Sequence, residues 1–154
     1  MDVQLYNAVS VIIPDEFSAA DSDQSKGYFG GTKFDYTFLN QEKSAAAGIV
    51  QTGAALTNET VEAKLGAYQQ YYSRMVPGFA MGEMRKSSKQ GREFGLMTYK
   101  SNAPTTDLFN MLAVTSLEDR EVVFLFSCDM RDARKYMYQF LGILESVSFL
   151  NEIR

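Results

Sequence analysis

The segment DLFNMLAVTSLEDREVVFLFSC, residues 107–128, predicts a hairpin at the centre of a sheet. Residues 107–116 and 120–128 are two apolar runs of strand length, and the short link LED between them is typical of a hairpin. Apolar residues occupy both faces of the first run, with Leu108, Leu112 and Val114 on one face and Phe109, Met111 and Ala113 on the other. A strand with two apolar faces lies centrally in a sheet that is covered on both sides.

Five further strands are predicted. NAVSVIIP (7–14) and TKFDYTFLN (32–40) alternate in polarity, and AAGIVQTGAAL (46–56) is small and compatible with a strand. Residues 79–101 contain two strands joined by the polar tip SSKQG. The polar segment that follows the strand at 7–14, residues 15–31, is expected to be a loop.

Two helices are predicted from apolar spacing. The first spans 58–78, with Asn58 as N-cap and a stop at Pro77-Gly78, and the second spans 129–149, with Asp129 as N-cap. Their apolar stripes are Val61, Leu65, Tyr68, Tyr72, Met75 and Val76 in the first helix, and Ala133, Met137, Phe140, Leu141, Leu144 and Val147 in the second.

These elements predict one α+β domain, residues 1–154, in which an antiparallel sheet of about six strands packs with two long helices. Apolar residues make up 45% of the chain, enough for a full core. The formal net charge of −4 disfavours nucleic acid as a partner. The start of the chain shows neither a signal peptide nor a membrane span, and the cytoplasm is therefore the expected compartment.

The composition lowers the expectation of catalysis. The chain has no histidine, which removes the usual general base and the usual zinc ligand. The single cysteine, Cys128, cannot form an internal disulfide, and Asp129 beside it opposes a thiolate; we interpret it as a buried residue at a strand end rather than a nucleophile. The acidic segment 21–27 lacks the glycine and the final glutamate of a calcium loop. We therefore predict no metal and no cofactor.

A partner surface is the main functional expectation. Both faces of the strands at 107–128 need cover, yet each of the two helices offers only one apolar stripe. If both helices pack on the same face, the other face must be covered by strands, by a second copy of the protein or by an apolar partner segment. If they pack on opposite faces, the stripes would leave apolar area uncovered near an edge of the sheet. A homodimer is the simplest way to satisfy such a patch, and the rival is a monomer whose segment 15–31 folds over that face. The residues predicted to line the surface are Phe34, Tyr36, Phe38, Phe109 and Met111, with Tyr138 as an exposed aromatic candidate on the last helix.

Four cations in residues 85–92 mark a second, weaker candidate for partner contact.

The order of elements resembles the Mog1/PsbP-like superfamily, and in particular the bacterial domains labelled DUF1795. Besides the hairpin at 111–128, the segments that carry the resemblance are VSVIIPDEF (9–17), YYSRMVPGF (71–79), SSKQGREFGLMTYK (87–100) and ILESVSF (143–149). The resemblance implies an antiparallel sheet of about six strands packed with helices, and no enzyme chemistry. Members serve as a Ran-binding nuclear-transport factor, an extrinsic photosystem subunit and bacterial chaperones that shield transmembrane segments of secretion effectors. No site residue is carried over from them.

Three functions remain open at this point. The first is a non-enzymatic bacterial binding module, an adaptor or chaperone-like protein with a protein partner. The second is a domain whose sheet face accepts an apolar ligand or lipid, which a continuous apolar groove would favour. The third is an enzyme that uses carboxylates such as Asp35 and Glu93, which two close carboxylates in a concave pocket would favour.

Overall fold

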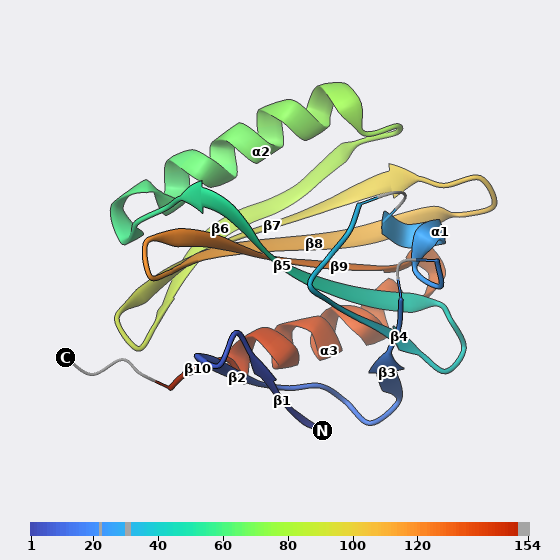
Figure 1. Cartoon of the computed structure of the whole chain (residues 1–154). Helices are drawn as coiled ribbons and strands as arrows, with labels where there is room; N and C mark the ends of the chain where they lie inside the picture. The colour runs from blue at the N-terminus through green and yellow to red at the C-terminus, as the bar shows by residue number, and fades with distance from the viewer. Residues whose placement is uncertain (22, 30–31, 151–154) are drawn as a thin grey trace.

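The computed structural model describes residues 1–21, 23–29 and 32–150 (Figure 1). The strands are β1 (Asp2–Leu5), β2 (Val9–Ile12), β3 (Phe17–Ala19), β4 (Tyr36–Asn40), β5 (Ala45–Ala55), β6 (Ala80–Lys89), β7 (Arg92–Asn102), β8 (Asp107–Leu117), β9 (Arg120–Asp129) and β10 (Ser148–Phe149). The α-helices are α1 (Lys26–Phe29), α2 (Val61–Met75) and α3 (Ala133–Glu145), and short 3₁₀ turns, Asn58–Thr60 and Met130–Asp132, precede α2 and α3.

Two antiparallel sheets form the fold, which is α+β as predicted. The large sheet has seven strands in the order β3-β4-β5-β9-β8-β7-β6, and the small sheet has three in the order β1-β2-β10. The prediction of about six strands is close for the large sheet. The hairpin at 107–128 is confirmed as β8–β9, and β5 and β7 flank it on its two sides.

Tight turns close the two long hairpins. Gln90 and Gly91 join β6 to β7 with φ of 53° and 76°, and Glu118 and Asp119 join β8 to β9 with φ of 54° and 62°. Positive φ at both central residues is the geometry of a type I′ turn, whose twist matches that of the flanking strands. The second turn adopts it without a glycine. The predicted polar tip SSKQG is therefore mostly strand, and only its last two residues form the turn.

The two long helices cover opposite faces of the large sheet (Figure 1). Leu65 of α2 packs with Leu112 and Val114, whereas Phe140 of α3 packs with Met111 and Ala113. Alternate residues of β8 thus supply the two cores, as expected for a strand buried on both sides. On the α2 face, a Cβ at Gly95 would lie 3.1 Å from Val61, so glycine lets the helix approach β7 closely.

The face under α3 receives a second cover that the sequence did not predict. The small sheet lies beside α3 (Figure 1), and its residues Leu5, Val9 and Val11 belong to the same buried cluster as Phe124 and Phe140. The chain itself therefore buries most of this face.

The first helix begins and ends differently from the prediction. Asn58 is not the N-cap: its side chain donates to the Gly91 carbonyl at 2.9 Å and accepts from the Glu93 amide at 3.1 Å. It thereby fastens the start of the helix to the β6–β7 hairpin instead of capping it. Met75 was expected in the apolar stripe, but it is 61% exposed, because it lies on the flank of the helix rather than over the sheet.

The first loop is also more structured than predicted. Within residues 15–31, the chain forms the edge strand β3, which pairs with β4, and the one-turn helix α1. Both elements are too short to show a periodicity in the sequence. They form through contacts with segments elsewhere in the chain. Among the described residues, none of the helices is long and apolar enough to cross a membrane.

Candidate functional site

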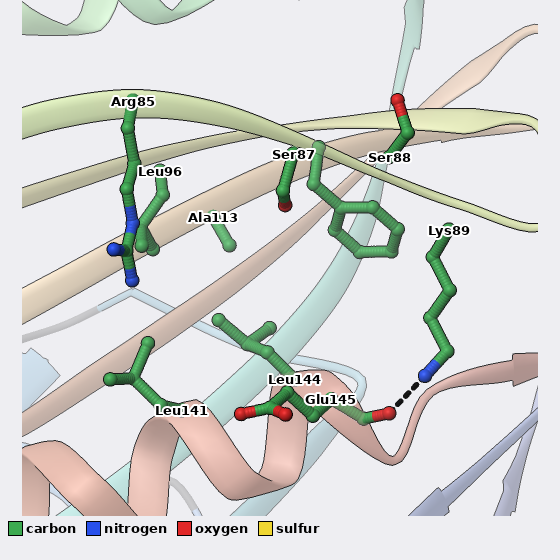
Figure 2. Close-up of a pocket in the computed structure, with 10 residues that line it drawn as sticks. Arg85, Ser87, Ser88, Lys89, Leu96, Ala113, Leu141, Leu144 and Glu145 are labelled. Carbon is green, nitrogen blue, oxygen red and sulfur yellow. Dashed lines mark hydrogen bonds between the residues drawn. The ribbon is translucent and has the colours of Figure 1, made fainter.

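A groove of about 380 Å³ lies between the β6–β7 edge of the large sheet and helix α3. Figure 2 shows Arg85 pointing from the sheet toward α3, and Leu141 and Leu144 pointing from α3 toward the strands. The ten lining residues are Arg85, Ser87, Ser88, Lys89, Phe94, Leu96, Ala113, Leu141, Leu144 and Glu145.

Strand register builds the floor of the groove. Arg85 is paired with Leu96 and Ser87 with Phe94, and Leu96 is paired in turn with Ala113 on β8. Paired residues of neighbouring strands share a face of the sheet, so the inner strands supply an apolar floor while β6 supplies a polar rim.

Helix α3 provides the opposite wall. Its buried residues are Tyr136, Phe140 and Ile143, which point into the core. Leu141 and Leu144 are only half-buried, because they lie on the flank of the helix nearest the sheet edge. Both leucines pack against the edge of the core and also line the groove.

Charged groups stand at the rim. Lys89 Nζ donates to the main-chain carbonyl of Glu145, a contact that bridges β6 to the end of α3 (Figure 2). The Glu145 carboxylate is exposed. Within the described part of the chain, the Arg85 guanidinium makes no hydrogen bond or ion pair. An arginine left free beside an apolar floor is available to an anionic group of a ligand.

Two of the residues predicted to line a partner surface are buried instead. Phe38 is 5% exposed and Met111 is 1% exposed, and both lie in one cross-strand row with Ala47 and Phe126. Their row faces α3, which covers it. In this structure neither side chain is available to a partner.

The other four predicted residues are scattered. Tyr36 is half-buried on the α3 face, where its hydroxyl accepts from the Tyr6 amide at 3.0 Å. Phe34 precedes β4 and lies on the opposite face, with its ring directly over Gly48. Phe109 is half-buried at the edge of the α3 core. Tyr138 is 69% exposed on the outer side of α3, and the structure does not bring it together with the rest.

Cys128 is fully buried, as the sequence indicated. Burial raises the pKa of its thiol to about 12, and the nearby carboxylates of Asp132 and Asp129 act in the same direction. A thiol in this state is a packing residue rather than a nucleophile.

The two carboxylates considered for catalysis do not form a pair. Asp35 precedes β4 and accepts from the Tyr6 hydroxyl at 2.6 Å, whereas Glu93 lies on β7. Three strands separate β4 from β7, so the two groups lie roughly 19 Å apart or more at a strand spacing of about 4.8 Å. This separation removes the geometric support for a carboxylate pair at these positions.

The acidic segment 21–27 shows a local turn. The Asp21 carboxylate accepts from the Gln24 amide at 2.8 Å, and the Gln24 side chain accepts from the Asp21 amide at 3.0 Å. Residue 22 lies outside the described residues. Among those that are described, no three histidine, cysteine, aspartate or glutamate side chains gather where they could hold a metal ion.

The sequence carried a partial signal for the groove. The cations of residues 85–92 and the stripe residues Leu141 and Leu144 were each visible, but nothing local showed that these two leucines face Arg85 across a gap. That arrangement depends on how α3 lies against the sheet, which the sequence pattern does not specify.

Comparisons with solved structures identify the fold. The chain superposes on cyanobacterial PsbP (CyanoP) from Synechocystis sp. PCC 6803 with a TM-score of 0.69 at 10% identity, covering 97% of this chain and 92% of that one. It matches LpqN of Mycobacterium tuberculosis, a protein involved in cell envelope biogenesis, with a TM-score of 0.62 at 9% identity, covering 92% and 82%. It matches the Saccharomyces cerevisiae Ran-binding protein Mog1p with a TM-score of 0.53 at 10% identity, covering 96% and 94%.

The chain therefore has the Mog1/PsbP-like fold, as its resemblance to that superfamily indicated. No protein-family model matches the chain, and no curated protein matches it in sequence. At identities of 9–10% the likeness establishes the fold alone.

Proposed function

We propose that this protein is a non-enzymatic binding module, an adaptor or chaperone-like protein of bacterial type, that holds an extended segment of a partner protein. The single observation that carries the proposal is the groove between the β6–β7 edge and α3. Its apolar floor and wall can take up side chains of a partner, and its polar rim can bond the partner's backbone.

The chemistry of the groove suits binding better than reaction. Its lining contains one carboxylate, Glu145, and two cations, Arg85 and Lys89, beside apolar and hydroxyl side chains. A proton-transfer mechanism needs an acid and a base that face the same bound atom, and these charged groups stand at the rim rather than on the floor. Binding requires only the apolar surface and the rim.

The structural neighbours are compatible with this proposal. Mog1p is a Ran-binding protein, so the fold is used elsewhere to bind a protein. The comparison contributes no residue to the site here, which rests on the geometry of this chain.

A second candidate function is the binding of a small apolar ligand with an anionic head, such as a fatty acid. The observation that favours it is the free Arg85 guanidinium at one side of an apolar groove. A fatty acid would place its carboxylate on Arg85 and its chain along Leu96 and Leu144.

Selection of peptides from a random library displayed on phage tests the proposed function. Peptides that bind the native protein should lose at least about tenfold in affinity to Leu144→Lys, because the lysine puts a charge into the apolar wall. The matched control is Tyr138→Lys, on the outer side of the same helix, which should leave their affinity unchanged.

Two outcomes would reject the proposal. One is that no peptide is enriched, while palmitate binds the native protein and binds Leu144→Lys weakly; this would favour the small ligand. The other is that enriched peptides bind Leu144→Lys and the native protein equally well, which would locate the binding surface elsewhere.

A further inference from the structure

The outer edge of β6 lies directly beside the groove and is open. Ten residues long, β6 pairs only with β7 within the described part of the chain, and nearly all of its residues are exposed. An edge strand presents alternate N–H and C=O groups that can pair with another strand. The opposite edge of the sheet, β3, has only three residues and offers little to pair with.

A bulge limits the usable part of this edge. The register with β7 shifts between Met81 and Met84, and the Glu83 amide there donates to the Thr98 hydroxyl at 3.0 Å. A bulge bends and twists the strand locally, so it ends regular pairing. Beyond it, residues 84–89 run in unbroken register with β7 up to the turn.

The charge of this segment restricts what can pair with it. Residues 84–89, MRKSSK, carry three cations and no acid. Cations on an edge strand are a common protection against pairing between copies, because two identical segments would bring six cations together. The same charges attract a strand that carries acids. Lys86 is already paired with Glu62 at 3.2 Å, so Arg85 and Lys89 are the cations that disfavour a second copy and favour an acidic partner.

Side-chain alternation specifies the pattern that such a partner needs. Arg85, Ser87 and Lys89 share the face that looks toward α3, since they pair with residues of β7 on that face. A strand added beside β6 would place successive same-face residues next to these three. Acids suit the positions beside Arg85 and Lys89, and an apolar residue suits the middle position, from which it can reach Leu141 and Leu144 across the groove.

We propose that the partner segment binds as an additional β-strand on residues 84–89 of β6, with an acidic, an apolar and an acidic residue at positions i, i+2 and i+4 on its α3 side. This inference rests on the proposed function and names the chemistry of its partner. Main-chain pairing supplies affinity in strand addition, and the alternate side chains supply specificity.

The test uses three blocked peptides of equal length with serine or threonine at the intervening positions. The first has glutamate, leucine and glutamate at alternate positions, the second has lysine, leucine and lysine, and the third has glutamate, serine and glutamate. By fluorescence anisotropy, the first should bind about tenfold or more tightly than either of the others, because it alone offers both ion pairs and the apolar side chain. Hydrogen exchange of the amides of residues 84–89 should slow when it binds.

Charge reversal supplies the control. The double change Arg85→Glu and Lys89→Glu should transfer the preference from the first peptide to the second, whereas Arg134→Glu, at an exposed position of α3, should change nothing. Equal binding of the acidic and basic peptides would overturn the inference, as would binding without protection of the β6 amides. In either case the proposed function would stand if phage-selected peptides still depended on Leu144.

Discussion

At the scale of single residues, Glu121 shows how the α2 face of the sheet is held. Its carboxylate is 1% exposed on β9, and it accepts hydrogen bonds from the Thr52 hydroxyl at 2.6 Å and the Tyr68 hydroxyl at 3.0 Å. The ammonium of Lys64 lies 3.9 Å away. Because Lys64 and Tyr68 both belong to α2, this one buried acid ties the helix to the sheet.

We predict that Glu121→Ala lowers the free energy of unfolding by about 1–3 kcal/mol, because it removes the buried carboxylate that accepts from the half-buried Tyr68 hydroxyl and the Thr52 hydroxyl. Urea denaturation measures the change. Glu42→Ala, at an exposed carboxylate, should cost less than about 0.5 kcal/mol. Equal effects of the two substitutions would mean that the buried cluster adds nothing to stability.

At the scale of elements, the long segments were predictable, whereas several short ones, including β1, β3 and α1, were not. Both long helices, the β6–β7 hairpin and the β8–β9 hairpin follow from periodicity and turn residues over ten or more positions. In contrast, β3 and α1 have three and four residues. β3 is defined by its pairing with β4, and α1 is a single turn whose Tyr28 hydroxyl donates to the Lys43 carbonyl at 2.8 Å. The ends of α2 also depended on tertiary contacts, since Asn58 bonds to the β6–β7 hairpin instead of capping the helix.

The buried stripe of α3 can be tested in the same way. Phe140 is fully buried against Phe126, with ring centroids 4.9 Å apart. We predict that Phe140→Ala costs about 3–5 kcal/mol in urea denaturation, through lost burial and the cavity that remains. Tyr138→Ala, two positions away on the exposed side, should cost less than about 0.5 kcal/mol. A small effect at Phe140 would contradict the packing of α3 on the sheet.

At the scale of the whole molecule, the sequence predicted a partner surface lined by Phe34, Tyr36, Phe38, Phe109 and Met111, and the structure does not bring these residues together on one open face. The strand faces that supplied the predicted surface, including Phe38 and Met111, turn inward because α3 and the small sheet cover them. An open groove lined by apolar side chains lies instead at the β6–β7 edge, where Leu141 and Leu144 of α3 are half-buried. The pattern of a strand shows which of its faces are apolar. Only the placement of the helices shows which part of those apolar faces is left uncovered.

The buried acidic groups predict a loss of stability at alkaline pH. Burial raises the pKa of the Cys128 thiol to about 12, and burial likewise raises the pKa of the Tyr99 phenol above its ordinary value. Both groups stay protonated in the native state at a pH where the unfolded chain releases their protons. Their contribution to stability is therefore complete below the pKa that each group has in the unfolded chain, and it is lost as the pH rises toward the pKa that the group has in the native state.

We therefore predict a steady free energy of unfolding up to about pH 8 and a decline above it of ~1.4 kcal/mol per pH unit for each such group. Denaturation titrations across this range measure the slope. Cys128→Ala should remove the part of the decline that begins near the ordinary thiol pKa of about 8.5 and should leave the tyrosine part at higher pH. A slope that is unchanged in this variant would contradict the assignment to the thiol.

Methyl-group NMR with a phage-selected peptide tests whether a partner segment binds in the groove between the β6–β7 edge and α3, because leucine methyls line both sides of the groove. We expect the largest shifts at Leu96, Leu141 and Leu144. Shifts confined to the exposed flank of α2, at Met75 and around Tyr71, would contradict binding in the groove.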